Sequence, residues 1–420
     1  MKNLFFLCSP SLGILDNWLP IIYELKNKSS VKCIIVFPET KTLNQINSDN
    51  TLIKISENLF DGIVFNLFNN TFLKADNFSQ LLSLNESKQF KLIFYLNSFI
   101  SRFRLNNFFL KSFVKKIFHF EAFDFSKLDS NECVLLFDLH ESEKSYNIEL
   151  LKTFQNSKKF SLLHGINLRG LRGQSEKTTV KEVFNCTALV FSMIEKDFYK
   201  SKYNLVDKQI ICSGIPRHDD KWVSFIKSFE KNNVKFNEYI LILSRQVCST
   251  VPLQNKIRYI KEIKVLSQKL NLPIVVKMHP KEIGENLYED IFGRSNKNWI
   301  ISNQHPFILA QNAVFCISFF SGVPIDMLYL AIPTIERLTL NGIKHQKDNF
   351  IKIDETSVSE YNYLGLVLGA NNYQEMEFYA NQILTNRKGI VDILKAKYLD
   401  IFNKHKISKL KLVDYILNSI

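Results

Sequence analysis

The stretch KNLFFLCSPSLGILDNWLPIIYELKNKSSVKCIIVFP, residues 2–38, decides the fold class. Residues 2–8 and 31–37 are short apolar runs of the kind that form buried strands. Between them, apolar side chains recur at helical spacing over residues 17–26. A strand, a helix and a strand at this spacing form a β-α-β unit, which implies a parallel sheet.

The same alternation continues along the chain in two series. In the first series, strands are predicted at 62–68, 133–139, 159–165, 188–193 and 209–214. In the second, they are predicted at 239–244, 273–279, 299–302, 312–318 and 332–336. Helices are expected at 86–120, 253–270, about 324–330 and throughout 374–420. We therefore expect an α/β protein with a first domain at 1–220, a linker at 221–238, a second domain at 239–400 and a C-terminal helix at 401–420.

The composition fits this organisation and limits the class of partner. A length of 420 residues suits two domains. The formal net charge of +13 favours anionic partners, although an AT-rich genome would also enrich lysine. Zinc-finger spacing and RNA-binding aromatic signatures are missing, so a nucleic-acid partner is not expected. The seven cysteines form no CxxC pair, which predicts reduced thiols and a cytoplasmic location.

Neither of two apolar stretches is expected to act as a signal peptide or a membrane span. The first apolar run is only about six residues long and then meets Pro10, so it is too short for a signal peptide. Residues 313–335 are nearly uncharged, but Pro324, Asp326 and Pro333 interrupt them. Strand, helix and strand are the better interpretation of that segment.

Two segments of the second series predict an anion site. VVKMHPKE (275–282) places Lys277 and His279 at the end of a strand, where parallel sheets bind ligands. Both side chains can donate hydrogen bonds to a phosphate, and a solvated loop is the alternative. In CISFFSGVP (316–324), Ser318 ends a strand, and Ser321 and Gly322 open a helix. A hydroxyl and free N–H groups at such a position bind anions, and an ordinary helix cap is the alternative.

Further candidates lie at other predicted strand ends and at the domain junction. In LLHGINLRG (162–170), His164 ends a strand and can act as a general base, unless it is a turn histidine bound to backbone. Arg245 ends the first strand of the second series and is a candidate phosphate ligand. In SGIPRHDDK (213–221), Arg217 and Asp219 form a charged turn, which is either a hinge or a contact to phosphate or sugar.

Several familiar sequence motifs do not occur. GxGxxG does not follow the first strand, and GxxxxGK[ST] is missing. Asp-x-Asp pairs and His/Cys clusters at metal spacing are also missing. The sequence therefore predicts a reaction that needs neither a metal nor a cofactor.

The order of these motifs resembles that of the GT-B glycosyltransferases. HGINLRG, GIPRHD, KMHP and FSGVPIDMLYLAIPTIE follow one another as in bacterial surface-polysaccharide transferases. The His-Gly loop and the Gly-x-Pro-Arg-x-Asp turn are similar to those of the CDP-glycerol glycerophosphotransferases. The His-Pro motif is similar to that of the polysialyl- and Kdo-transferases. The chain departs from the first group at Ile166, where Thr or Ser is usual, and lacks the acidic-acidic-Gly motif of the polysialyltransferases.

The resemblance implies a fold and a role for each candidate. It implies two Rossmann-like domains whose parallel sheets face a central cleft, with the donor nucleotide on the second domain. There the donor phosphate would contact Arg245, Lys277, His279, Ser318, Ser321 and Gly322. His164 would be the catalytic base, and Asp16 is a second candidate. Arg217 and Asp219 would lie at the junction, and Glu336 would contact the ribose or sugar of the donor.

The expected function is a metal-independent transfer of a sugar or polyol-phosphate to a growing surface glycan such as a capsule, O-antigen or teichoic-acid-like polymer. The donor would be nucleotide-activated, with CMP- or CDP-linked donors favoured over UDP-linked ones, and the acceptor would be a glycan or a lipid-linked glycan. One alternative is a sugar-nucleotide 2-epimerase of the same architecture, which would use acidic residues in the cleft. The other is a non-enzymatic interaction protein, which would not need Lys-His and Ser-Gly at successive strand ends.

One segment of the first series predicts contact with an anionic membrane surface. SRFRLNNFFLKSFVKKIF (101–118) interleaves phenylalanine with arginine and lysine at helical spacing. An apolar stripe flanked by cations suits an interfacial helix on the inner face of the cell membrane. The alternative is that the stripe packs on the sheet and the cations are solvated.

Overall fold

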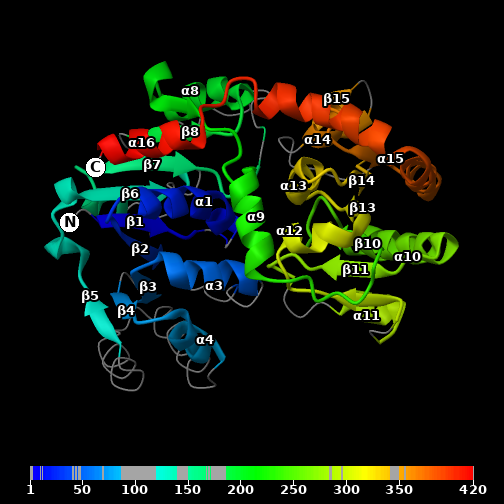
Figure 1. Cartoon of the computed structure of the whole chain (residues 1–420), viewed down its shortest axis with the longest axis horizontal. Helices are drawn as coiled ribbons and strands as arrows, with labels where there is room; N and C mark the ends of the chain where they lie inside the picture. The colour runs from blue at the N-terminus through cyan, green and yellow to red at the C-terminus, as the bar shows by residue number, and fades with distance from the viewer. Residues whose placement is uncertain are drawn as a thin grey trace.

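The chain forms two α/β units joined by a helix, as the computed structural model shows (Figure 1). The structure describes residues 3–9, 11, 13–39, 42, 45, 49–68, 71–86, 120–139, 150–166, 168, 171, 186–282, 286–294, 297–340, 350–353 and 356–419. Residues 87–119 lie outside the described residues. They include the predicted interfacial helix 101–118 and nearly all of the predicted helix 86–120.

The first unit is built on a nine-stranded sheet in the order β5-β4-β3-β2-β1-β6-β7-β8-β9. Its parallel strands are β1 (Asn3–Leu7), β2 (Lys32–Phe37), β3 (Gly62–Phe68), β6 (Cys133–Phe137), β7 (Lys158–Leu162), β8 (Thr187–Val190) and β9 (Ile210–Cys212). Each of them was predicted from an apolar run. Two strands with antiparallel pairing at one side of the sheet, β4 (Thr71–Ala75) and the edge strand β5 (Glu121–Phe123), were not predicted.

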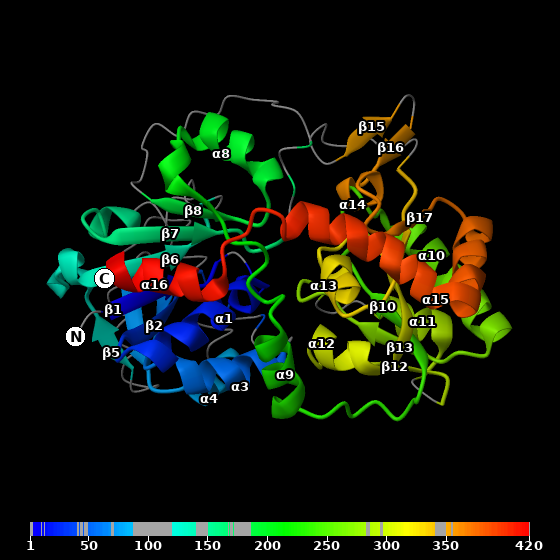
Figure 2. The same ribbon diagram turned by 45° about the horizontal axis from the view of Figure 1, so that its top comes forward.

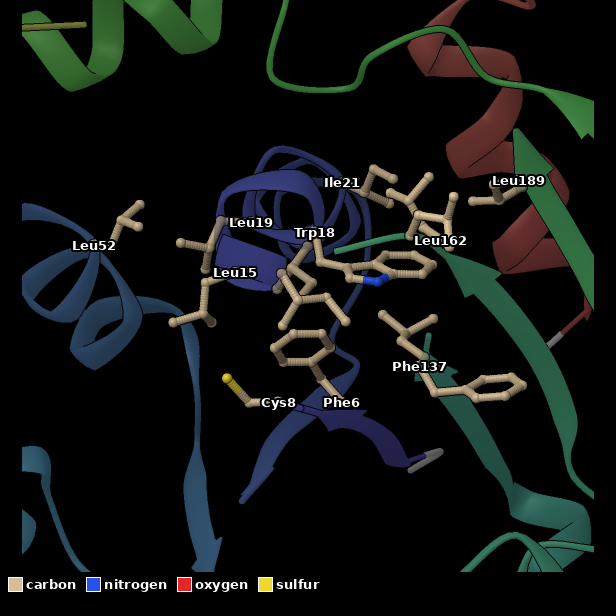
Figure 3. Packing of buried hydrophobic residues seen from close by; sticks show 14 of the residues in the cluster. Phe6, Cys8, Leu15, Trp18, Leu19, Ile21, Leu52, Phe137, Leu162 and Leu189 are labelled. Atoms are coloured by element: carbon tan, nitrogen blue, oxygen red, sulfur yellow. The ribbon is translucent and has the colours of Figure 1, made fainter. Parts of the chain in front are cut away.

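Helices cover this sheet, and α1 (Gly13–Lys28) provides much of the core. Trp18 of α1 is fully buried and lies with its ring centroid 6.4 Å from that of Phe6. Figure 3 shows Trp18 and Leu15 pointing from the helix toward Phe6 on β1. Burial of one such side chain contributes about 1.5–3 kcal/mol, so the α1 stripe fixes the helix on the sheet. Helices α3 (Asn50–Leu59), α4 (Phe78–Glu86) and α8 (Lys196–Tyr203) also belong to this unit.

The second unit contains a six-stranded, all-parallel sheet in the order β12-β11-β10-β13-β14-β17. Its strands are β10 (Tyr239–Leu243), β11 (Ile274–Lys277), β12 (Trp299–Ile301), β13 (Ala313–Ser318), β14 (Thr334–Arg337) and β17 (Leu368–Ala370). Strands β10 and β13 are buried throughout, as expected for parallel strands covered on both faces. The covering helices are α10 (Leu253–Leu270), α11 (Leu287–Phe292), α12 (Pro306–Leu309), α13 (Val323–Tyr329) and α14 (Glu360–Tyr363), and a small hairpin pairs β15 (Ile351–Ile353) with β16 (Thr356–Val358).

The chain crosses between the two units twice. Helix α9 (Asp220–Phe229) and the segment 230–238 lead from the first sheet to the second. Helix α15 (Tyr373–Phe402) lies on the second unit, and α16 (Lys409–Ser419) returns to the first (Figure 2). There α16 packs against α1, and Lys28 Nζ lies 2.7 Å from Asp414 Oδ1. The prediction of an unbroken helical tail is therefore wrong at residues 403–408.

None of the described helices is long and apolar enough to cross a bilayer. All seven cysteines are free thiols, and six of them are buried.

Candidate active site

A cavity of about 560 Å³ lies between the two sheets and receives side chains from both units. Many of its lining residues follow the carboxyl ends of β1, β7, β10, β11 and β13. This is the edge at which parallel sheets bind ligands, and the volume falls in the usual range for a small-molecule site.

The wall from the first unit carries an Asp–His pair. Asp138 and His164 follow the adjacent parallel strands β6 and β7, so their side chains meet at the sheet edge. Asp138 is fully buried, and its Oδ2 lies 2.6 Å from Nδ1 of His164. The same oxygen accepts the backbone N–H of His164 at 3.1 Å. Nδ1 is therefore the protonated nitrogen, and the half-buried ring presents Nε2 as the acceptor nitrogen.

Asp138 is a site residue that the sequence interpretation missed. The sequence did contain a signal, since an aspartate directly follows the apolar run CVLLF. A buried aspartate is rare unless it has a partner, so an aspartate at this position indicates a paired carboxylate. Its partner, His164, was predicted as a base at the edge of the sheet, and the structure places it in the cavity.

Asp16 also lines the cavity, but both of its oxygens face cationic partners. Oδ1 lies 3.2 Å from Nε2 of His305, and Oδ2 lies 3.4 Å from Nε of Arg217. Burial alone would lower the pKa of His305, but the charge of Asp16 and its hydrogen bond outweigh burial and raise the pKa. Asp16 is thus part of an ionic contact between the two units, and its role as a second base remains a prediction.

The junction residues contribute to the same contact. Arg217 is buried, and its Nε and Nη2 donate to the two carboxylate oxygens of Asp326 on α13 at 2.7 and 3.1 Å. Its Nη1 donates to the side chain of Asn17 on α1. Arg217 lines the cavity, but this geometry assigns it to holding the units together. Asp219 is not among the described residues that line the cavity. Its Oδ1 accepts the backbone N–H of Trp222, which caps α9, and also accepts from Lys409 Nζ at 2.9 Å. These contacts lie at the junction and fit the hinge alternative of the prediction.

The wall from the second unit carries Arg245 and His279. Arg245 follows β10, and its guanidinium lies 5.9 Å from the ring centroid of Phe320, a cation–π distance. Its Nε is buried without a hydrogen-bond partner among the described residues. Phe320 lines the cavity with a left-handed φ of 60°, which is strained for an aromatic residue. Strain of this kind is typical of functional sites, and Arg245 is available to an anion.

His279 is held neutral. Burial is the main cause that lowers its pKa to about 3, and the charges of Arg245, Lys281 and Lys256 lower it further. Nδ1 of His279 accepts the backbone N–H of Lys281 at 3.1 Å. The proton of the neutral ring is therefore on Nε2, which makes His279 a hydrogen-bond donor to a ligand oxygen.

Three other predicted anion ligands also line the cavity. Nζ of Lys277 lies 3.4 Å from Asp49 Oδ2 on the first unit and 3.1 Å from the carbonyl of Asn303, so it already has partners. Ser321 and Gly322 precede α13, and Oγ of Ser321 accepts the backbone N–H of Val323 at 3.3 Å. The cap interpretation thus applies to Ser321, and its exposure to the cavity allows a ligand contact as well.

Two predictions are wrong. Ser318 and Glu336 pair with each other across β13 and β14, and neither occurs among the described residues that line the cavity. Ser318 is fully buried, so its hydroxyl cannot reach a donor phosphate. Glu336 is buried and accepts from Ser359 Oγ, and burial raises its pKa to about 7. The acidic residue that does line this part of the cavity is Glu360, whose Oε1 accepts the backbone N–H of Leu168 at 3.3 Å.

Within the described ranges, no group of three or more His, Cys, Asp or Glu side chains is arranged to hold a metal ion.

Comparison with known proteins places this fold. No protein-family model and no curated protein matches the chain. Among solved structures, the UDP co-structure of MnaA from S. aureus is 12% identical with a TM-score of 0.53, covering 100% of this chain and 98% of that one. A UDP-N-acetylglucosamine 2-epimerase is 11% identical with a TM-score of 0.53, covering 99% and 95%. The wall teichoic acid polymerase TagF is 12% identical with a TM-score of 0.52, covering 99% and 89%. The chain therefore has a GT-B-type fold of two Rossmann-like domains, and the predicted fold class is confirmed.

Proposed function

We propose that the chain is a metal-independent transferase that moves a sugar or polyol-phosphate from a nucleotide-activated donor to a growing surface glycan. One observation carries the proposal: a histidine oriented by a buried carboxylate faces the same cavity as a neutral histidine and an arginine. The first pair suits an acceptor hydroxyl, and the second suits a phosphate. A polymerase of a surface polymer and UDP-binding proteins share the fold, which supports this choice of substrates.

On the acceptor side, His164 is the general base. Nε2 takes the proton of the acceptor hydroxyl while the oxygen forms its new bond to the transferred group. Asp138 holds the ring through Nδ1–H and stabilises the imidazolium that results. A positioned base of this kind contributes about 10²–10⁴-fold to the rate.

On the donor side, Arg245 and His279 receive the leaving nucleotide. The bond from the transferred group to the phosphate oxygen of the nucleotide breaks, and its electron pair stays on that oxygen. The guanidinium of Arg245 and the Nε2–H of His279 stabilise the negative charge as it develops. Both groups lie on one domain and the base lies on the other, so the reaction requires both walls of the cavity.

The proposal also includes the class of donor and the location of the enzyme in the cell. The MnaA structure contains UDP, and a TagF structure with the same fold was soaked with the ligand abbreviated CDPG, which supports a nucleotide-activated donor. The sequence motifs still favour a CMP- or CDP-linked donor. Free thiols fit a reducing compartment, so we place the enzyme in the cytoplasm, where it would act on a glycan or lipid-linked acceptor.

The alternative is a sugar-nucleotide 2-epimerase, because proteins of that class share the fold and acidic residues line the cavity. Each of these carboxylates already has a partner, however. Asp16 faces His305 and Arg217, and Asp49 pairs with Lys277. Asp326 pairs with Arg217 and His218, and Glu360 accepts a backbone N–H. The Asp138–His164 pair is the better-prepared base, and it favours the transferase.

A donor-consumption assay separates the two functions. The protein is incubated with CDP-glycerol, a CMP-linked sugar or UDP-N-acetylglucosamine, with and without a glycan acceptor, and products are identified by mass spectrometry and ³¹P NMR. Nucleotide release that requires the acceptor supports the transferase. Conversion of the UDP-sugar to its C2 epimer without an acceptor supports the epimerase and would refute the transferase. The His164→Ala variant is the control for contaminating activity.

A further inference from the structure

Glu282 lies beneath the phosphate wall and is not part of the cavity lining. Its carboxylate has no exposed side-chain area and forms an ion pair with Lys256, which is equally buried. Oε2 accepts the backbone N–H of His279 at 2.5 Å, and Oε1 accepts from Oγ of Ser244 at 2.7 Å. One buried carboxylate therefore has three donors, each from a different part of the domain.

These donors connect the two segments that present Arg245 and His279. Ser244 directly precedes Arg245 at the end of β10, and Tyr288 of α11 donates to its Oγ at 2.6 Å. His279 belongs to the turn after β11. Through Ser244 and the backbone of His279, Glu282 links the loop after β10 to the turn after β11.

The turn after β11 also determines which ring nitrogen of His279 carries the proton. The backbone N–H of Glu282 donates to the carbonyl of His279 at 2.9 Å, which closes the turn. In this conformation the N–H of Lys281 reaches Nδ1 of His279 at 3.1 Å. A turn of another shape would lose that contact, and Nε2 would no longer be the only protonated nitrogen.

We propose that Glu282 is a positioning residue for the phosphate site, which holds the two loops so that His279 presents Nε2–H and Arg245 its guanidinium to one phosphate group. The identity of that ligand rests on the proposed function. A purely structural role is the competing explanation. Against it, a buried ion pair is weak evidence for stability, since apolar side chains of similar size often replace one without loss. An apolar side chain could not accept the N–H of His279.

The test is a variant that keeps the fold and removes the acceptor. Glu282→Ala alone would remove the carboxylate that pairs with the buried Lys256, and breaking a buried ion pair in this way costs about 3–5 kcal/mol. The double variant Lys256→Met with Glu282→Leu removes both charges and should remain folded. Glu262→Gln is the matched control, because Glu262 pairs with Arg337 in the same domain and is not among the described residues lining the cavity.

Two readouts decide the outcome. By ¹⁵N NMR of the histidine ring, His279 should be the Nε2–H tautomer in the wild type and in the Glu262 control, and a mixture of tautomers in the double variant. The KM for the donor should rise about tenfold or more, as for loss of a hydrogen bond to a charged group, and kcat should fall as well because His279 also stabilises the charge that develops on the leaving nucleotide. An unchanged tautomer together with an unchanged KM would overturn the proposal.

A milder variant covers the case in which the double variant fails to fold. Ser244→Ala removes the link to the loop of Arg245 and leaves Glu282 bound to His279. It should raise the donor KM without changing the tautomer, and a donor KM equal to that of the wild type would contradict the proposal. If none of the donors is consumed, the proposed function fails, and the ring spectrum still decides whether Glu282 controls His279.

Discussion

Oδ2 of Asp138 lies 2.6 Å from Nδ1 of His164, although the two residues are 26 positions apart in the sequence. The contact gives the two ring nitrogens different roles, because Nδ1 donates its proton to the carboxylate and Nε2 is left as the acceptor nitrogen.

Asp138→Asn should lower kcat about 10²–10⁴-fold with little change in the donor KM, because an amide cannot hold the ring in the same tautomer. Steady-state kinetics at saturating donor measure the effect. Asp61→Asn is the control, since it changes a carboxylate that binds Lys26 and the Cys33 N–H in the same domain. A kcat within about twofold of wild type would remove His164 from the role of base.

His279→Ala should abolish activity and leave the thermal stability of the unliganded protein nearly unchanged. The side chain follows a strand at the ligand edge and contributes a donor to the site. His279→Gln, which keeps an N–H donor, should restore part of the donor affinity. Full activity of the alanine variant would refute the assignment, and unfolding of that variant would indicate a structural histidine instead.

Glu336→Gln should stabilise the protein more at pH 8 than at pH 5. Burial raises the folded-state pKa of Glu336 to about 7, above the unfolded value of about 4.5. The folded state therefore binds the proton more tightly, and stability falls as pH rises from about 4.5 to about 7. Glutamine removes this loss, which amounts to about 3 kcal/mol at most. Denaturant unfolding at both pH values measures the difference, with the exposed Glu238→Gln as control; equal effects at the two pH values would contradict the prediction.

Activity should survive an excess of chelator, because the sequence contains no carboxylate pair spaced for divalent coordination. Turnover is compared before and after treatment with EDTA and after addition of magnesium or manganese. A loss that either metal restores would show that a ligand set exists elsewhere in the chain.

The segment 101–118 should bind anionic vesicles and not neutral ones. Each basic residue near an anionic surface contributes about 1 kcal/mol, so binding should weaken at high salt and in the variant K111E/K115E/K116E. Co-sedimentation with liposomes measures the bound fraction. Equal recovery in the supernatant with both kinds of lipid would contradict membrane binding, and the net charge of +13 would then need another explanation.

Much of the fold could be predicted because most strands are buried on both faces. Runs such as residues 239–243 are apolar at every position, and they stand out without an alignment. The edge strand β5 is three residues long and mostly exposed, so it carries no such signal. The prediction for residues 133–139 extended past the end of β6, because the site residue Asp138 directly follows the apolar run.

The candidate site was predicted less completely, for a geometric reason. Parallel strands share one edge, so His164, Arg245 and His279 could be placed together from the sequence, and the structure brings all three to one cavity. Which side of the sheet a terminal side chain occupies could not be predicted, and Ser318 and Glu336 were misplaced for that reason. Contacts such as those of Asp138 and Glu282 depend on strand register and loop shape, which one sequence does not specify.

The return of α16 to the first domain has a consequence for synthesis on the ribosome. Residues 412, 413 and 416 of α16 are buried in the same apolar cluster as β1 and α1. The two helices are far apart in the sequence, since Lys28 of α1 and its partner Asp414 of α16 are separated by 386 positions. Until these residues emerge, the outer face of α1 lacks its cover. The core of the amino-terminal domain is therefore completed only when α16 docks, after the carboxyl-terminal domain has been translated.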